Sequence, residues 1–140
     1  MKFGDFVKVK SLNNPAGFTQ NLHRLGLEMP CDELLESGPQ SVMSQPLQIG
    51  SLRVGNRYAV HPMEGWDGHA DGNPSEHTIR RWRNFGLSGA KLIWGGEAVA
   101  VRHDGRANPR QLVINEKTLP ALGNLRETLV NAHRESMGDD

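Results

Sequence analysis

Apolar and polar residues alternate in two short runs near position 50, residues 46–50 and 52–55. Successive side chains of a strand point to opposite faces, so this alternation is typical of half-buried strands. Gly50 and Ser51 stand between the apolar positions of the two runs, which favours a tight turn. The pattern therefore predicts a β-hairpin.

Two further runs have the apolar content of interior strands, residues 58–60 and 90–94. The first of them ends abruptly at His61 and Pro62. Proline has no N–H and restricts the preceding residue to an extended conformation. Ligands in α/β folds bind at the carboxyl ends of strands, so we expect a ligand to bind near this point.

Helical spacing lies between these two strands, where Ile79, Trp82 and Phe85 recur at every third position. Asn73 followed by Pro74 predicts the start of this helix, because Asn is a favoured N-cap and Pro is favoured in the first turn. We expect the helix to end near Gly86.

A second apolar stripe at helical spacing begins at Leu119 and continues to Val130. Its helix is predicted to start between Asn115 and Pro120, with an irregular first turn. The order from residue 46 is then hairpin, strand, helix, strand, helix. Strands that alternate with helices indicate β/α units around a parallel sheet.

Residues 1–45 lack this pattern, and we expect them to form an irregular extension ahead of a domain at residues 46–140. Within the extension, residues 6–9 alternate as in a short strand, residues 13–17 carry a turn signal, and residues 32–36 favour a single helical turn.

Composition excludes several classes of function. The 16 basic and 16 acidic residues balance, so nothing indicates binding to nucleic acid. Cys31 is the only cysteine, which rules out a disulfide within the chain and fits a reducing cytoplasm. No apolar run approaches the roughly 20 residues of a membrane span. We therefore expect a cytoplasmic protein that acts on a small molecule.

Three segments carry a family resemblance. Residues 55–63 read Gly-Asn-Arg-Tyr-Ala-Val-His-Pro-Met after the hairpin, and residues 89–98 read Gly-Ala-Lys-Leu-Ile-Trp-Gly-Gly-Glu-Ala. Residues 129–133 read Leu-Val-Asn-Ala-His. In this order and spacing, residues 46–135 resemble the start of the old yellow enzyme family, the FMN-dependent NADH:flavin oxidoreductases.

The resemblance implies an α/β fold, the N-terminal part of a (β/α)8 TIM barrel that comprises a bottom hairpin and the first two β/α units. FMN would lie across the carboxyl mouth of the barrel. NAD(P)H would reduce the flavin, which would pass hydride to an activated alkene or a related acceptor. The implied flavin contacts are His61, Pro62, Met63, Glu64 and Ala98, and Trp66 would line the substrate pocket.

Two departures from the family pattern have consequences. Glu64 stands where the family commonly has Thr or Cys; an ionised carboxylate there would lower the flavin potential, whereas a protonated or Arg-paired one would act as a donor. The family's substrate-binding pair and phosphate site belong to later strands, which two β/α units do not include. We therefore expect no catalytic residue in this chain, and weak or no binding of FMN by the chain alone.

Other interpretations remain open. A zinc site could use His61, Glu64 and His69, and further metal-ligand types lie nearby, although the spacing matches no strong zinc motif. The alternative is a solvated polar loop that binds no metal. The chain could also be a non-catalytic truncated or interaction fragment, because the edges of a two-stranded parallel sheet are open to pairing. The nearby residues of metal-ligand type are Asp67, Asp71 and His77.

The remaining motifs have ordinary structural explanations. We expect Trp82 and Trp94 to pack in the core, and the run of Arg80, Arg81 and Arg83 to lie on a solvated helix face, with a phosphate site as the alternative. The glycines at positions 95 and 96 are not part of a G-x-G-x-x-G motif, so a Rossmann fold is not indicated.

Overall fold

The computed structural model describes residue 4 and residues 6–138. The chain divides into two compact units, Met1–Ser41 and Val42–Asp140. Each unit is described by itself below. No helix in the described part of the chain combines the length and the apolar character needed to cross a membrane.

The first unit contains a helix, α1 (Pro15–Arg24), where an irregular segment was predicted. The Asn14 side chain caps it by accepting a hydrogen bond from the backbone N–H of Gly17, at 2.8 Å, and Pro15 occupies the first turn. The turn signal at residues 13–17 was thus the start of a helix, because Asn-Pro also favours an N-cap. The predicted strand at residues 6–9 and helical turn at residues 32–36 are absent, and Val9–Ser11 is a 3₁₀ turn.

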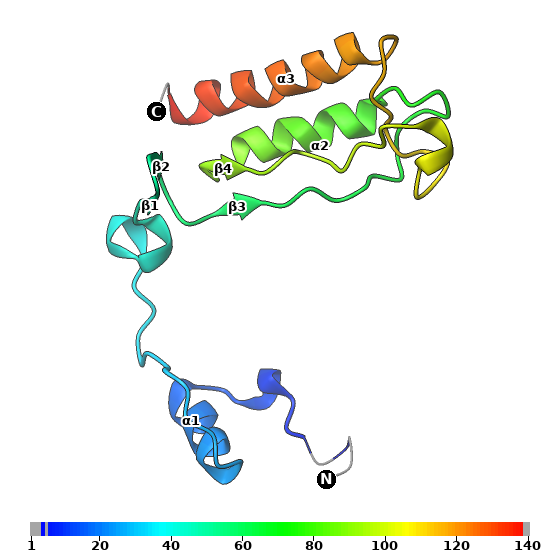
Figure 1. Ribbon diagram of the computed structural model, residues 1–140. Coiled ribbons are helices and arrows are strands. Elements are labelled where there is room, and N and C mark those ends of the chain that lie inside the picture. The colour runs from blue at the N-terminus through cyan, green and yellow to red at the C-terminus, as the bar shows by residue number, and fades with distance from the viewer. Residues whose placement is uncertain (1–3, 5, 139–140) are drawn as a thin grey trace. The chain divides into compact units, whose positions relative to one another are not determined.

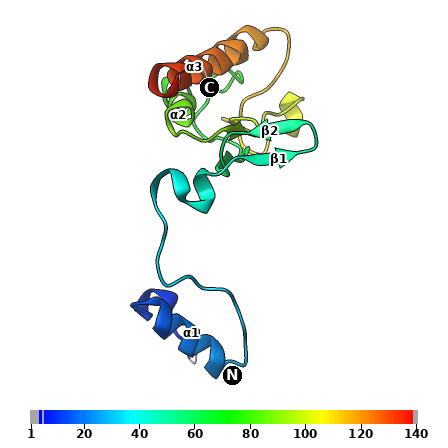
Figure 2. The ribbon, with the colours of Figure 1, turned by 90° about the vertical axis from the view of Figure 1, so that its left-hand side faces the viewer.

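The second unit begins with the predicted hairpin. Strands β1 (Leu47–Ile49) and β2 (Leu52–Val54) pair in antiparallel fashion, with Ile49 opposite Leu52 (Figure 2). Gly50 makes the turn at φ +58°, a left-handed conformation that glycine adopts without the cost of a Cβ. The hairpin prediction is confirmed.

Strands β3 (Ala59–Val60) and β4 (Leu92–Ile93) pair in parallel, each followed by a helix. Helices α2 (Glu76–Leu87) and α3 (Leu119–Met137) lie side by side on the same side of this pair (Figure 1). This order confirms a mixed α/β fold. Within residues 4 and 6–138 the strands form two two-stranded sheets and no closed barrel.

Helix α2 begins later than predicted. Its N-cap is Ser75, whose hydroxyl accepts hydrogen bonds from the backbone N–H groups of His77 and Thr78. The Thr78 hydroxyl in turn accepts from the backbone N–H of Ser75, which completes a capping box. The Asn73 N–H instead donates to Asp71 in a turn that precedes the helix. The reciprocal pair of hydroxyls therefore sets the helix start in place of the Asn-Pro signal.

The two helices make close contact at Gly86. A Cβ at this position would overlap the carbonyl oxygen of Leu129 on α3 and would lie 3.0 Å from the Cβ of Ala132. The glycine thus permits the backbones to approach closely. Leu125 and Ala132 of α3 are buried, and Leu112 and Val113 are buried in the loop before α3.

Trp94 does not pack in the core as predicted. It follows β4, its N–H donates to the carbonyl of Val60 at 2.9 Å, and 68% of the residue is exposed. Trp82 is half-buried and packs as predicted, since a Cβ at Gly96 would lie 2.7 Å from its indole ring. Strand β4 ends at Ile93, so Trp94 lies just beyond it, and no neighbouring element in the described residues covers its side chain.

Candidate functional site

A cleft of about 730 Å³ opens beside β3 and at its carboxyl end. Its size falls in the range of small-molecule sites. Strand β3, the loop after it, helix α2 and one residue after β4 all contribute to its walls. The lining residues are Ala59, Val60, His61, Met63, Glu64, Gly65, Trp66, Asp67, Arg81, Phe85 and Gly96.

The structure brings most of the predicted flavin contacts to this cleft. His61, Met63 and Glu64 line it and are exposed. Pro62 and Ala98 lie beside it and are half-buried. The Ala98 N–H donates to the Met63 carbonyl at 3.1 Å, so the two predicted contact segments touch directly.

Trp66, predicted to line a substrate pocket, lies in the cleft wall with 68% of the residue exposed. An exposed indole at a cleft presents a flat apolar face to an incoming ring.

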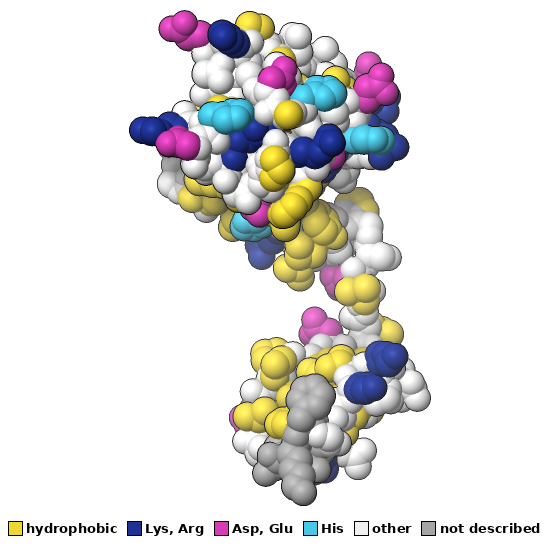
Figure 3. Space-filling model, turned by 90° about the vertical axis from the view of Figure 1, so that its right-hand side faces the viewer, with side chains coloured by type: hydrophobic (Ala, Val, Ile, Leu, Met, Phe, Trp, Pro, Cys, Tyr) yellow, Lys and Arg dark blue, Asp and Glu magenta, His cyan; other side chains and the backbone are white. Residues whose placement is uncertain are grey.

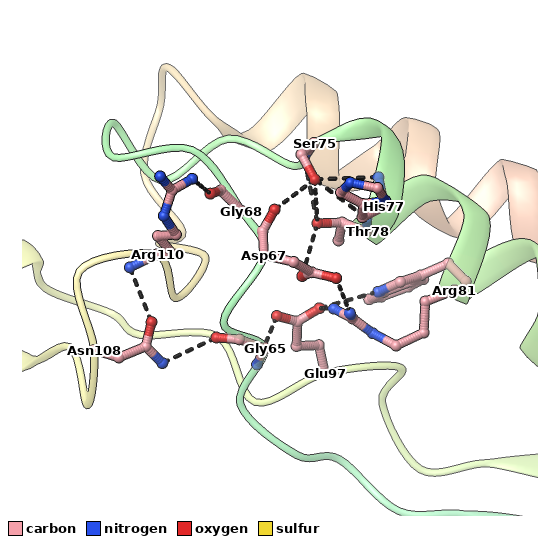
Figure 4. Close-up of polar contacts among 11 residues, drawn as sticks. Gly65, Asp67, Gly68, Ser75, His77, Thr78, Arg81, Glu97, Asn108 and Arg110 are labelled. Carbon is pink, nitrogen blue, oxygen red and sulfur yellow. Dashed lines mark hydrogen bonds and ion pairs between the residues drawn. The ribbon is translucent and has the colours of Figure 1, made fainter.

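An ion-pair triad, defined here as Asp67, Arg81 and Glu97, ties the two loops to α2 (Figure 4). One terminal nitrogen of Arg81 pairs with Asp67 in the loop after β3. The other donates to Glu97 Oε2 at 2.6 Å, in the segment after β4. The Glu97 side chain is only 1% exposed, so its charge depends on this partner for compensation.

The second oxygen of Glu97 holds the cleft loop. Glu97 Oε1 accepts a hydrogen bond from the backbone N–H of Gly65 at 2.9 Å (Figure 4). A Cβ at Gly65 would overlap this oxygen and would lie 2.7 Å from an Arg81 nitrogen. Only glycine therefore fits between the buried carboxylate and the guanidinium.

The loop is held from two other sides as well. The Asn108 amide donates to the Gly65 carbonyl at 2.9 Å, and the Gly68 N–H donates to the Arg110 carbonyl at 3.1 Å. The Thr78 hydroxyl, in the first turn of α2, donates to Asp67 Oδ1 at 3.2 Å. These contacts fix residues 65–68 on a rigid helix terminus and on the loop before α3.

The triad shifts the pKa values of two of its members. Burial alone would raise the pKa of Asp67, but the hydrogen bond and charge of Arg81, with the Thr78 hydroxyl, lower it below its usual value. Burial alone would lower the pKa of Arg81, but the hydrogen bonds and charges of Asp67 and Glu97 raise it. Both groups are therefore held in their charged forms.

The prediction that Arg81 lies on a solvated helix face is wrong. Arg81 is half-buried, and its two carboxylate partners stand 14 and 16 residues away in the sequence. No local motif spans those separations. The available signal was the chemical type of Asp67 and Glu97, since buried acids are found paired.

The alternative zinc site receives no support from the geometry. In residues 4 and 6–138, no group of three or more His, Cys, Asp and Glu side chains is placed to hold a metal ion. Two of the acidic residues near the candidate ligands have other partners: Asp67 pairs with Arg81, and Asp71 accepts a hydrogen bond from Asn73.

The loop-bearing end of the second unit carries basic, acidic and histidine side chains intermixed, without a broad area of one sign (Figure 3). In that region Arg102 pairs with Asp104, and Arg106 donates to the carbonyls of His69 and Ala70. The hydrogen bonds of Arg106 join the loop before α3 to the loop before α2.

Comparison with protein-family models gives no match for this chain, and comparison with curated proteins gives no similar sequence. The functional assignment therefore depends on the residues and the geometry of the cleft.

Proposed function

We propose that the second unit supplies the first two β/α units of an FMN-dependent NAD(P)H oxidoreductase, and that the cleft is one edge of its FMN site. The observation that carries this proposal is the hydrogen bond from the Ala98 N–H to the Met63 carbonyl. It joins the two segments that the resemblance implies for flavin contact, at the carboxyl ends of adjacent parallel strands.

The residues present fit one edge of a flavin ring. Residues 61 and 63–65 line the cleft together with Gly96, and the two glycines at positions 65 and 96 leave no room for a Cβ against Glu97 and Trp82. Trp66 offers an exposed aromatic face beside them, and Glu64 places a carboxylate at the mouth. When bound, FMN would accept hydride from NAD(P)H and pass it to a small-molecule acceptor, for which an activated alkene is the implied class.

Among the described residues that line the cleft, none offers a free arginine or lysine for the FMN phosphate. Of these residues, only Arg81 and His61 are basic in type, and both terminal nitrogens of Arg81 are engaged by carboxylates. A phosphate would therefore draw little affinity from the residues that line the cleft. Weak binding of FMN by this chain, and no catalysis by the chain alone, follow from the proposal.

A titration followed by NMR tests it. Lumiflavin, which has the ring system without the ribityl phosphate, and FMN are each added to the 15N-labelled chain. We expect shifts confined to the amides of residues 61, 63–66 and 96–98, with similar weak affinity for both ligands. Shifts elsewhere, an absence of shifts at millimolar ligand, or tight stoichiometric binding of FMN would each contradict the proposal.

A second candidate, a non-catalytic interaction fragment, is favoured by the open edges of the parallel pair. Strands β3 and β4 each have one neighbour within the described residues, so each leaves one edge unpaired. Hydrogen exchange of the isolated chain tests this second candidate. Weak protection of β3 and β4 would favour a fragment that pairs with other strands, and strong protection of both strands would count against it.

A further inference from the structure

The guanidinium of Arg81 links the two segments that the proposed flavin site needs. On one side it binds Asp67, three residues after Glu64, and on the other it binds Glu97, which directly precedes Ala98. Helix α2 therefore contacts both loops of the cleft through one side chain.

A short series of contacts runs from Arg81 to the backbone of the cleft. Arg81 engages Glu97 Oε2 and leaves Oε1 to accept from the Gly65 N–H. Gly65 lies two residues beyond Met63, whose carbonyl accepts from the Ala98 N–H. The orientation of the Glu97 carboxylate thus sets the spacing between residues 63–65 and residues 97–98.

We infer that Arg81 is a positioning residue of the proposed flavin site. It orients the buried Glu97 carboxylate, and this carboxylate in turn holds the backbone of the cleft loop. Its positive charge also offsets one of the two negative charges of Asp67 and Glu97. This inference rests on the proposed function. Arg81 itself does not touch the flavin in this role.

Lysine cannot replace it fully. The planar guanidinium donates from two nitrogens to two carboxylates on different loops, whereas an ammonium group is a single compact charge on a flexible stem. Without the cation, Glu97 would be a buried, uncompensated charge next to Asp67, and we expect its carboxylate to turn away from Gly65.

The test compares Arg81→Gln and Arg81→Lys with the matched control Arg83→Gln. Arg83 lies on the same helix, and its side chain is 51% exposed and pairs with Glu135 at 3.6 Å. Hydrogen exchange of the Gly65 and Ala98 amides reports the cleft, and exchange at Leu125 in α3 reports whether the fold is intact. Binding of lumiflavin is measured in its oxidised form and in its reduced, anionic form.

In Arg81→Gln we expect exchange of the Gly65 amide to accelerate about tenfold or more, which corresponds to loss of one charge-assisted hydrogen bond. Reduced anionic lumiflavin is expected to lose more affinity than oxidised lumiflavin, because a local positive charge is gone. Arg81→Lys should restore the relative affinity for reduced and oxidised lumiflavin. It should restore only part of the protection of the Gly65 amide from exchange. Arg83→Gln should leave all readouts unchanged.

Unchanged Gly65 exchange in Arg81→Gln with Leu125 still protected would overturn the inference, as would equal loss of affinity for the two flavin forms. If Arg81→Gln does not fold, Arg81→Lys decides by the same readouts. If the unmodified chain binds no lumiflavin, the proposed flavin site fails, while the Gly65 exchange still decides whether Arg81 holds the loop.

Discussion

At the scale of single residues, Asp67 should make the stability of the second unit depend on acid. Its pKa is lowered in the folded state relative to the unfolded value of about 3.9, so the folded protein binds this proton more weakly. The stabilisation is fully present above the unfolded pKa and is lost as the pH falls through the folded one. Asp67→Asn should therefore cost about 1 kcal/mol at pH 6 and less at pH 3, measured by urea unfolding at both pH values.

Asp104→Asn is the matched control. Hydrogen bonding by Arg102 lowers the pKa of Asp104 as well, but this pair is exposed and screened by solvent. We expect no measurable loss of stability in this variant. If Asp67→Asn lowers the free energy of unfolding by the same amount at pH 6 and at pH 3, the charge of Asp67 does not contribute to stability.

The triad also shows where sequence reasoning stopped. The contact segments around Met63 and Ala98 were implied by the family resemblance, and the structure places the two segments in contact with each other. The role of Arg81 was missed, because its partners are brought to it by the packing of α2 against both loops. Local patterns report which side chains share a helix face and do not report which loops fold over that face.

Gly65 makes a second residue-scale prediction. In Gly65→Ala the added Cβ would overlap Glu97 Oε1, so the buried carboxylate must move and the hydrogen bond from the residue 65 N–H must lengthen. We expect a loss of about 1–3 kcal/mol in the free energy of unfolding, measured with urea. Gly105→Ala, whose nearest neighbour would be the Arg102 Cβ at 3.9 Å, should change stability little. Equal losses in the two variants would contradict the crowded position assigned to Gly65.

At the scale of elements, the contact between α2 and α3 predicts that Gly→Ala substitutions at two positions will change stability in opposite directions. A Cβ at Gly86 would overlap the Leu129 carbonyl and force α3 away from α2. We expect Gly86→Ala to lower the free energy of unfolding by about 2 kcal/mol. Gly123 lies in α3 with no atom near the added Cβ, so Gly123→Ala should raise stability by about 0.5–1 kcal/mol through helix propensity.

Thermal unfolding followed by circular dichroism measures both variants. A stabilising effect of Gly86→Ala would mean that the helices are farther apart than the structure has them. A loss in Gly123→Ala would mean that this part of α3 is covered by a neighbour.

Comparison of the predicted and observed helices and strands shows which local signals are enough to predict an element. The hairpin was predicted from alternation, β3 and β4 from their apolar content, and the start of α3 within residues 115–120, because each depends on residues within a few positions. Helix α1 was missed because Asn14-Pro15 serves both turns and helix starts. The start of α2 moved to Ser75 because its reciprocal hydrogen bonds with Thr78 satisfy two backbone donors at once.

At the scale of the whole molecule, the division into two units predicts that the second folds without the first. The cleft, the triad and the contact between α2 and α3 all lie in residues 42–140, the unit that begins after Ser41. Trp66, Trp82 and Trp94 are the only tryptophans, and all three belong to this unit. Tryptophan fluorescence therefore reports unfolding of the second unit selectively, even in the full chain.

We expect the full chain and a chain of residues 42–140 to give the same fluorescence melting temperature within about 2 °C, since 1 kcal/mol would shift it by about 4–8 °C. Lumiflavin affinity should also be the same in both, because every residue of the cleft is retained. A lower melting temperature for residues 42–140 would show that the first unit packs against the second and stabilises it. Lower lumiflavin affinity at an unchanged melting temperature would place part of the binding site in residues 1–41, and the cleft beside β3 would then be only part of the site.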